Sequence, residues 1–242
     1  MIIIKRKINK IIQGDCLIVM KDISDKSIDM ILCDLPYGTT ACKWDTIIPF
    51  EPLWEQYKRI IKDNGAIVLT ASQPFTSALV MSNVKMFKYE WVWVKSKITG
   101  VLNAKKMPVR KHEQVLVFST NGLPKYYPQG MVKSGETVRQ GGNSQNYGER
   151  NKKEYVKEFS GCPRDVIEIP SEGKTVHPTQ KPVALFEYLI KTYTNEGDLV
   201  LDNCAGSGTT AVACINIKRK YILIEKEKEY IEIINKRIKE VG

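Results

Sequence analysis

Short apolar runs alternate with helix-like segments near the start of this chain. Residues 28–33 and 66–69 are nearly all apolar, which is typical of strands buried on both faces. Residues 52–61 carry apolar side chains at helical spacing, and Asp63-Asn64-Gly65 predicts a turn before the second run. Alternating strands and helices predict a parallel sheet.

The same pattern returns at the other end of the chain. Residues 199–201 and 221–224 predict strands, while residues 209–215 and the amphipathic, charged segment 228–239 predict helices. We therefore expect both ends to build a single α/β domain around a parallel sheet.

The middle of the chain has a different composition. Between residues 95 and 174 there are 15 Lys and Arg against 8 Asp and Glu, with many glycines and few apolar runs. We predict an inserted region at 96–174 between core segments 1–95 and 175–242. Residues 129–155 read as a long loop, which is either functional or disordered.

Overall composition narrows the class of protein. With 242 residues and 43% hydrophobic side chains, one good core is expected. No apolar run approaches the roughly 20 residues of a membrane span, and no cleavable leader follows the basic N-terminus, so a cytoplasmic protein is expected. Six cysteines without a C-x-x-C pair, and two histidines, predict buried thiols without a structural metal. The net charge of +10 favours a polyanionic partner.

A glycine-containing loop lies between the predicted strand at 199–201 and the following helix. Gly206 and Gly208 allow the backbone to approach a ligand, and the helix N-terminus offers free N–H groups. Glu225 ends the next predicted strand, where a carboxylate can accept both hydroxyls of a ribose. A nucleotide-like cofactor fits both features; a tight turn and a solvated glutamate are the alternative.

Asp34-Leu35-Pro36-Tyr37 follows the buried strand at 28–33. Ligands of open α/β sheets bind at the carboxyl ends of strands, so a carboxylate, a rigid carbonyl and an aromatic ring are expected at that edge. These groups suit an exocyclic amine, whose protons need acceptors and whose base needs a stacking surface. An Asp-Pro turn beside a core tyrosine is the alternative.

Here a family resemblance becomes specific. Asp34-Leu35-Pro36-Tyr37 resembles the D-P-P-Y motif of DNA amino-methyltransferases, and residues 202–210 resemble their D-P-F-x-G-S-G-T-T cofactor loop. The order of motifs resembles the beta arrangement of this family. The resemblance implies a circularly permuted Rossmann-like fold that uses S-adenosylmethionine, with an inserted target recognition region.

Two further segments carry the resemblance. Residues 177–182 resemble the H-P-T-Q-K-P segment of the family, and Gly14-Asp15-Cys16 resembles its G-D-C segment, although Asp15 is equally suited to capping a helix. The cofactor residues implied are Asp15, Cys16, His177, Thr179, Gln180, Lys181, Asp202, Ala205, Gly206, Ser207, Gly208, Thr209 and Glu225.

The catalytic residues that the resemblance implies are Asp34, Pro36 and Tyr37. Asp34 would accept one amine proton, a carbonyl at Leu35 or Pro36 the other, and Tyr37 would stack on the flipped base. Two departures weaken the match. Leu35 replaces the first proline of the motif and loosens the turn, and Asn203-Cys204 replaces Pro-Phe, which removes an apolar wall for the adenosine.

Double-stranded DNA is the partner that the resemblance implies. Basic clusters in the middle of the chain are expected to contact phosphates: Lys105, Lys106, Arg110, Lys111, Arg150, Lys152 and Lys153. A solvated basic face is the alternative reading.

Asp34 favours adenine N6 over cytosine N4, since N4 members more often begin the motif with Ser. A methyltransferase for RNA or protein amides, and a silent DNA-binding module, are further alternatives. A homodimer is predicted by analogy, and a restriction endonuclease, where one exists, would be a separate protein.

Overall fold

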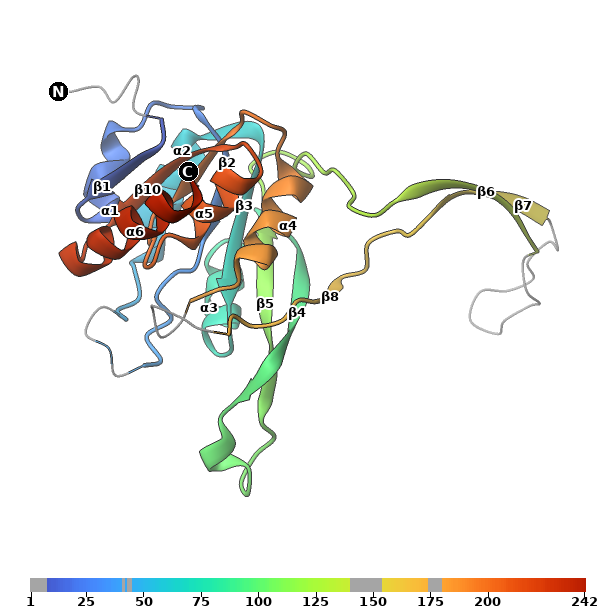
Figure 1. Ribbon diagram of the computed structural model, residues 1–242, viewed down its shortest axis with the longest axis horizontal. Helices are drawn as coiled ribbons and strands as arrows, with labels where there is room; N and C mark the ends of the chain where they lie inside the picture. Colours follow the sequence, from blue (N-terminus) through green and yellow to red (C-terminus); the bar gives the residue numbers. More distant parts are fainter. Residues whose placement is uncertain (1–7, 41, 43–44, 140–153, 174–179) are drawn as a thin grey trace. The chain divides into compact units, whose positions relative to one another are not determined.

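The computed structural model describes residues 8–40, 42, 45–139, 154–173 and 180–242. The chain forms two compact units: Met1–Tyr127 with Asp165–Gly242, and Pro128–Arg164. The first unit holds a large sheet with its helices, and the second holds a two-stranded ribbon (Figure 1).

The first unit consists of an eight-stranded sheet and six helices in its described part. Its strands are β1 (Lys10–Gln13), β2 (Ile28–Cys33), β3 (Ile61–Ala71), β4 (Phe87–Thr99), β5 (Arg110–Phe118), β8 (Val166–Glu168), β9 (Leu199–Asp202) and β10 (Lys220–Glu225). Its helices are α1 (Cys16–Val19), α2 (Phe50–Ile60), α3 (Phe75–Ser82), α4 (Val183–Tyr193), α5 (Thr209–Asn216) and α6 (Lys228–Val241), with short 3-10 turns η1 (Met20–Asp22) and η2 (Val101–Asn103).

The strand order is β1-β10-β9-β2-β3-β5-β4-β8. The first five strands in this order are parallel to one another, whereas β5 is antiparallel to both β3 and β4. Counted from β9, the parallel strands lie in the order 3-2-1-4-5, which is that of a doubly wound sheet whose chain ends fall between its second and third strands. The strand order reverses between β9 and β2, and ligands of such sheets bind at that crevice.

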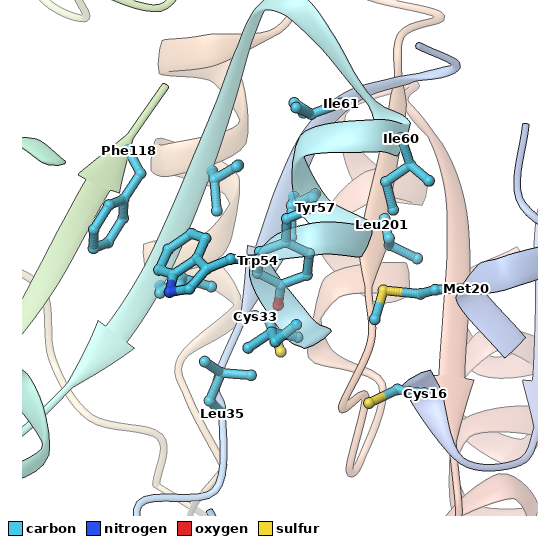
Figure 2. Close-up of a cluster of buried hydrophobic side chains, with 14 of the residues drawn as sticks. Cys16, Met20, Cys33, Leu35, Trp54, Tyr57, Ile60, Ile61, Phe118 and Leu201 are labelled. Atoms are coloured by element: carbon cyan, nitrogen blue, oxygen red, sulfur yellow. The ribbon is translucent and has the colours of Figure 1, made fainter. Parts of the chain in front are cut away.

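Alternation along the central strands separates two hydrophobic cores. Ile31 and Cys33 of β2 face one core, whereas Met30 and Leu32 face the other. Helices α1, α2 and α3 cover the first core, and α4, α5 and α6 cover the second. Figure 2 shows the first core, where Trp54 and Tyr57 of α2 pack against the sheet. The sheet is thus buried on both faces, as the apolar runs predicted.

The turn predicted at Asp63-Asn64-Gly65 differs from the structure. Residues 63–65 lie within β3, where residues 62–65 bulge opposite Asp29 between the pairs Ile28↔Ile61 and Met30↔Ala66. Gly65 is required there, because a Cβ would lie 2.8 Å from the carbonyl oxygen of Asp29. The predicted turn is therefore a bulge within a strand that continues through it.

Part of the predicted insertion belongs to the main sheet. The predicted insertion 96–174 includes β5, which pairs with β3 inside the main sheet, and β8, which pairs with β4. Within the expected loop 129–155, β6 (Val132–Arg139) pairs with β7 (Glu154–Ser160) in an antiparallel ribbon. Polar residues occupy most positions of both strands. The sequence therefore lacks the alternation of apolar and polar positions that predicts a strand.

All six cysteines are free thiols, and Cys16, Cys33 and Cys214 are buried. Cys162, in contrast, is exposed, which the general expectation of buried thiols missed. Among the described helices, none is long and apolar enough to cross a membrane.

Candidate active site

A cavity of about 980 Å³ opens at the carboxyl ends of β2 and β9 in the first unit. Asp34, Pro36 and Tyr37 line it beside the predicted cofactor loop. The predicted cofactor residues in its wall are Asp15, Cys16, Gln180, Lys181, Asp202, Ala205, Gly206, Ser207, Thr209 and Glu225. Two motifs 168 positions apart therefore meet because β2 and β9 are neighbours, with Ile31 paired to Leu201.

The side chain of Glu225 is hydrogen-bonded to the glycine loop. Its Oε2 accepts a hydrogen bond from the backbone N–H of Gly206 at 2.7 Å, and its Oε1 accepts one from Glu227 at 2.8 Å. Gly206 has a φ of 50°, in the left-handed region that glycine adopts without strain. Burial raises the pKa of Glu225, although these backbone donors oppose the shift. Each oxygen retains acceptor capacity toward the cavity.

Gly208 serves packing instead of the cavity wall. Its φ is 78°, and a Cβ there would lie 2.8 Å from Cγ2 of Ile234 on α6. The open side of Gly208 therefore meets α6, and its role toward the cofactor stays a prediction. Arg237, also on α6, donates to the carbonyl oxygen of Ser207 at 2.7 Å and fastens the loop.

Asp202 organises the loop from beneath. Its side chain accepts hydrogen bonds from the hydroxyl of Thr210 and from the backbone N–H of Cys204, the latter at 3.1 Å. Burial raises the pKa of Asp202 to about 6, against the opposing effect of the Thr210 hydroxyl. Asp15 likewise caps α1, accepting from the N–H of Leu17 at 2.9 Å. Both carboxylates therefore stabilise the backbone of the cavity wall through local hydrogen bonds.

Asp34 lies at the centre of a polar cluster. Its Oδ1 accepts hydrogen bonds from the hydroxyl of Tyr37 at 2.8 Å and from the hydroxyl of Thr70. Its Oδ2 accepts from Nζ of Lys181 at 2.7 Å. These contacts fix the direction of the carboxylate, which is a requirement for a positioned acceptor.

Lys181 joins Asp34 to a second buried acid. Its Nζ lies 3.3 Å from Oε2 of Glu113, and Oε1 of Glu113 is 2.9 Å from Nζ of Lys95. Burial would lower the pKa of Lys181, but Asp34 and Glu113 outweigh it and the pKa lies above its ordinary value. Burial would likewise raise the pKa of Glu113, but Lys181 and Lys95 outweigh it and the pKa is lowered. The four groups form an alternating chain of charges.

Aromatic and apolar contacts support the Asp34 segment. The ring of Tyr37 stacks on Phe75 of α3, with centroids 5.1 Å apart and planes 23° apart. Burial raises the pKa of the Tyr37 hydroxyl well above its ordinary value, so it stays a donor. Leu35, which replaces the family proline, is 3% exposed and packs into the first core (Figure 2). The packing of Leu35 in the core therefore holds this segment in place, although the stiffness of a proline ring is absent.

Asp45 holds the segment that follows Tyr37. Its carboxylate accepts hydrogen bonds from the backbone N–H groups of Gly38, Thr39 and Thr40 at 2.8, 2.9 and 2.7 Å. Although burial opposes it, donors from Thr40 and Gly38 lower the pKa of Asp45. Thr39, Thr40 and Asp45 all line the cavity, so Asp45 shapes its rim.

A family model described as DNA methylase matches residues 28–236, which include both loops and the polar cluster between them. The chain belongs to the N6/N4 DNA methylase family. This DNA methylase is 28% identical to the type II methyltransferase M.HpaI of Haemophilus parainfluenzae, over 95% of the chain and 74% of the relative. It is also 28% identical to the DNA adenine methyltransferase YhdJ of Escherichia coli, over 94% of the chain and 82% of the relative.

Solved structures of similar proteins agree with the fold of the methylase. The M1.HpyAVI complex with SAM has a TM-score of 0.63 and 26% identity, covering 94% of this chain and 98% of the other. The cytosine-N4-specific PvuII DNA methyltransferase has a TM-score of 0.72 at 15% identity, covering 96% and 86%. The second likeness is one of fold.

The remaining predicted residues of the methylase lie in the cavity wall, on exposed segments or outside the described residues. Lys181, predicted for the cofactor, lines the cavity with its ammonium on Asp34 and Glu113. Lys105, Lys106 and Lys111 are exposed near the turn between β4 and β5, and Arg110 borders the cavity. Five predicted residues lie outside the described part of the chain: His177, Thr179, Arg150, Lys152 and Lys153.

Other residues of the methylase site were missed from the sequence. Thr70 ends a buried run next to β2, so the rule that singled out Asp34 also applies to it. Glu113 and Lys95 had no such signal, because their pairing depends on the antiparallel register of β4 with β5. Trp93 is 2% exposed and also lines the cavity.

Proposed function

We propose that this DNA methylase transfers a methyl group from S-adenosylmethionine to the N6 amine of adenine within a specific double-stranded DNA sequence. One observation carries the proposal: Asp34, Gly206 and Glu225 line the same cavity of about 980 Å³. That volume lies at the upper end of the range for small-molecule sites, which leaves room for a cofactor and a base together.

The residues around the glycine loop fit S-adenosylmethionine. The oxygens of Glu225 keep acceptor capacity for two ribose hydroxyls, while the strand end and left-handed Gly206 keep the loop flat against the ligand. Leu17, Ile47 and Ile48 also line the cavity and offer the apolar wall that Asn203-Cys204 does not supply. The SAM complex of M1.HpyAVI supports this assignment. When bound, the cofactor supplies an electrophilic sulfonium methyl group.

The residues around Asp34 fit an exocyclic amine. Asp34 would accept one amine proton, and the carbonyl of Leu35 or Pro36 the other, so that the nitrogen lone pair leaves conjugation with the ring. As the new N–C bond forms, the amine becomes more acidic, and Asp34 is positioned to receive its proton. Lys181 keeps a positive charge 2.7 Å from this carboxylate.

Tyr37 fits the role of a stacking surface. One face of its ring meets Phe75, and Nζ of Lys181 lies over the ring, 5.5 Å from its centroid. An unstacked base would stack on this ring beside the ammonium. Its hydroxyl donates to Asp34, so the same residue orients the acceptor and the base. Stacking on such a ring contributes about 1–3 kcal/mol per base in other proteins.

Adenine is favoured over cytosine by Asp34 at the first motif position and by the likeness to YhdJ across most of both chains. Lys105, Lys106, Arg110 and Lys111 would contact phosphates. A homodimer and a separate restriction endonuclease remain predictions.

The test is transfer of a labelled methyl group from S-adenosylmethionine to genomic DNA, followed by nucleoside analysis and site mapping. We expect N6-methyladenine with the wild-type protein and with Asp22→Ala, an exposed aspartate outside the cavity. Asp34→Ala is expected to bind the cofactor without transferring the methyl group. Product N4-methylcytosine would replace the adenine assignment, and transfer to RNA or protein but to no DNA would overturn the function.

A further inference from the structure

The outer part of the β4–β5 hairpin has a composition unlike the rest of the first unit. We call residues 96–112 the arm. They include five Lys and Arg and no Asp or Glu. All are exposed except Val109, which is half-buried. In Figure 1 the arm is the green ribbon that extends beyond the other strands of this sheet, with η2 at its end.

The end of the arm is apolar. Leu102 has an exposed fraction of 102%, and Val101 and Met107 have 57% and 58%. A two-stranded ribbon with nothing packed on it is marginally stable, and grouped exposed apolar side chains mark a contact surface. Packing within the described part of the unit does not account for these side chains.

The base of the arm is a wall of the active site. Lys97, Thr99, Arg110 and His112 line the same cavity as Asp34. Strands rise about 3.3 Å per residue, so the five steps from Lys95 to Gly100 span up to roughly 16 Å. That length exceeds the depth of about 8.5 Å of the major groove of B-DNA. A duplex that places a base at Asp34 is therefore within reach of the arm.

We propose that the arm inserts its apolar end, led by Leu102, into the base stack beside the extruded target base. This inference rests on the proposed function. Extruding a base costs stacking and pairing energy and leaves a gap, and apolar side chains fill such gaps in other DNA-bending proteins. The cationic flanks, Lys105, Lys106, Arg110 and Lys111, meet the phosphates on either side.

Charge favours DNA over a second copy of this chain as the occupant. In a symmetric contact the same patch meets itself, so five cations of one arm would face five of the other without an acid to compensate. A polyanion removes that repulsion. The arm therefore fits a nucleic acid better than its own copy.

The experiment compares Leu102→Ser with the wild-type protein on two oligonucleotide duplexes that carry the mapped site. In one the target base is paired, and in the other it lies opposite an abasic position, where extrusion costs less. We expect Leu102→Ser to lose about tenfold or more in kcat/KM on the paired duplex, as for loss of one buried leucine. On the abasic duplex it is expected to stay within about twofold of the wild type.

Two control variants separate insertion from other effects. Leu123→Ser changes a leucine that is 71% exposed and lies outside the arm, so wild-type rates are expected on both duplexes. Lys105→Gln is expected to lose activity equally on both duplexes and to weaken the salt dependence of binding. Since Leu102 is fully exposed, the melting temperature of Leu102→Ser should match that of the wild type.

The outcomes distinguish this inference from the proposed function. Equal loss on both duplexes, or no loss on either, overturns the insertion while leaving the methyltransferase intact. A change of oligomeric state in Leu102→Ser without rescue by the abasic position assigns the arm to contact between copies and also overturns it. If the wild type methylates no DNA, the proposed function fails and the insertion fails with it.

Discussion

Asp34 and Asp202 stand at equivalent places on neighbouring strands. Asp34 follows β2, Asp202 ends β9, and both line the cavity. Asp202 is 3% exposed and accepts from Thr210 and from a backbone N–H of its own loop. The Asp34 side chain is 21% exposed and accepts from Lys181 and two hydroxyls.

We propose that environment, and not position in the strand-loop unit, separates a catalytic carboxylate at Asp34 from a structural one at Asp202. Asp202 is buried among local donors, which raises its pKa to about 6. Asp34 has a cation beside it and an opening toward the ligand. Two identical side chains thereby take different roles, as is known of paired carboxylates elsewhere.

Substituting both residues in the same way is the strongest test of this comparison. Asp34→Asn is expected to reduce kcat by about 10² or more, because an acceptor for the amine is lost in the transition state. The affinity for S-adenosylmethionine, measured by calorimetry, should stay unchanged. Asp202→Asn is expected to retain more activity and to weaken cofactor binding instead. Equal loss of kcat in both variants would contradict the comparison.

Lys181 sharpens the account of Asp34. In Lys181→Met, Asp34 and Glu113 lose the cation between them, and the pKa of Glu113, which Lys181 helps to lower, is expected to rise. We expect a loss of about tenfold in kcat/KM at pH 7 and an acidic limb of the pH–rate profile shifted upward. Lys181→Arg, which keeps the charge, should restore the profile. An unshifted profile with weaker cofactor binding would return Lys181 to its predicted cofactor role.

Glu225 tests the other side of the cavity. Glu225→Gln removes the charge that accepts from Gly206 and that we propose for the ribose hydroxyls. Affinity for S-adenosylmethionine should fall about tenfold, as for a hydrogen bond to a charged group, while kcat at saturating cofactor changes little. The measurements are cofactor titration and steady-state kinetics. A fall in kcat with unchanged affinity would show that Glu225 acts on the chemistry.

A final effect concerns the pH dependence of stability. The folded pKa of Asp202, about 6, lies above its ordinary value of 3.8. The folded state therefore holds this proton more tightly, so the contribution of Asp202 is present below pH 3.8 and is lost as the pH rises through 6. Relative to Asp202→Asn, the wild type should lose roughly 6–12 °C of Tm over this interval, because about two pKa units correspond to about 3 kcal/mol. A constant difference across the pH series would contradict the raised pKa.

Much of the fold and half of the site were accessible from residue patterns. The apolar run 28–33 is β2 with the predicted bounds, and the runs at 199–201 and 221–224 lie within β9 and β10. Strands buried on both faces leave such unbroken runs, so their existence follows from local composition. Asp34, Gly206 and Glu225 followed from their places after those strands, since sheet ligands bind at carboxyl ends.

What the tertiary structure decided is which of these residues act together. Antiparallel β4 and β5 bring Glu113 beside Lys95, and the segment before α4 places Lys181 between Glu113 and Asp34. The open side of Gly208 meets Ile234 of α6 for the same reason. The sequence alone determined the strands and the chemical groups at their ends. The distances that turn those groups into an ionic network depend on long-range packing, which no local pattern encodes.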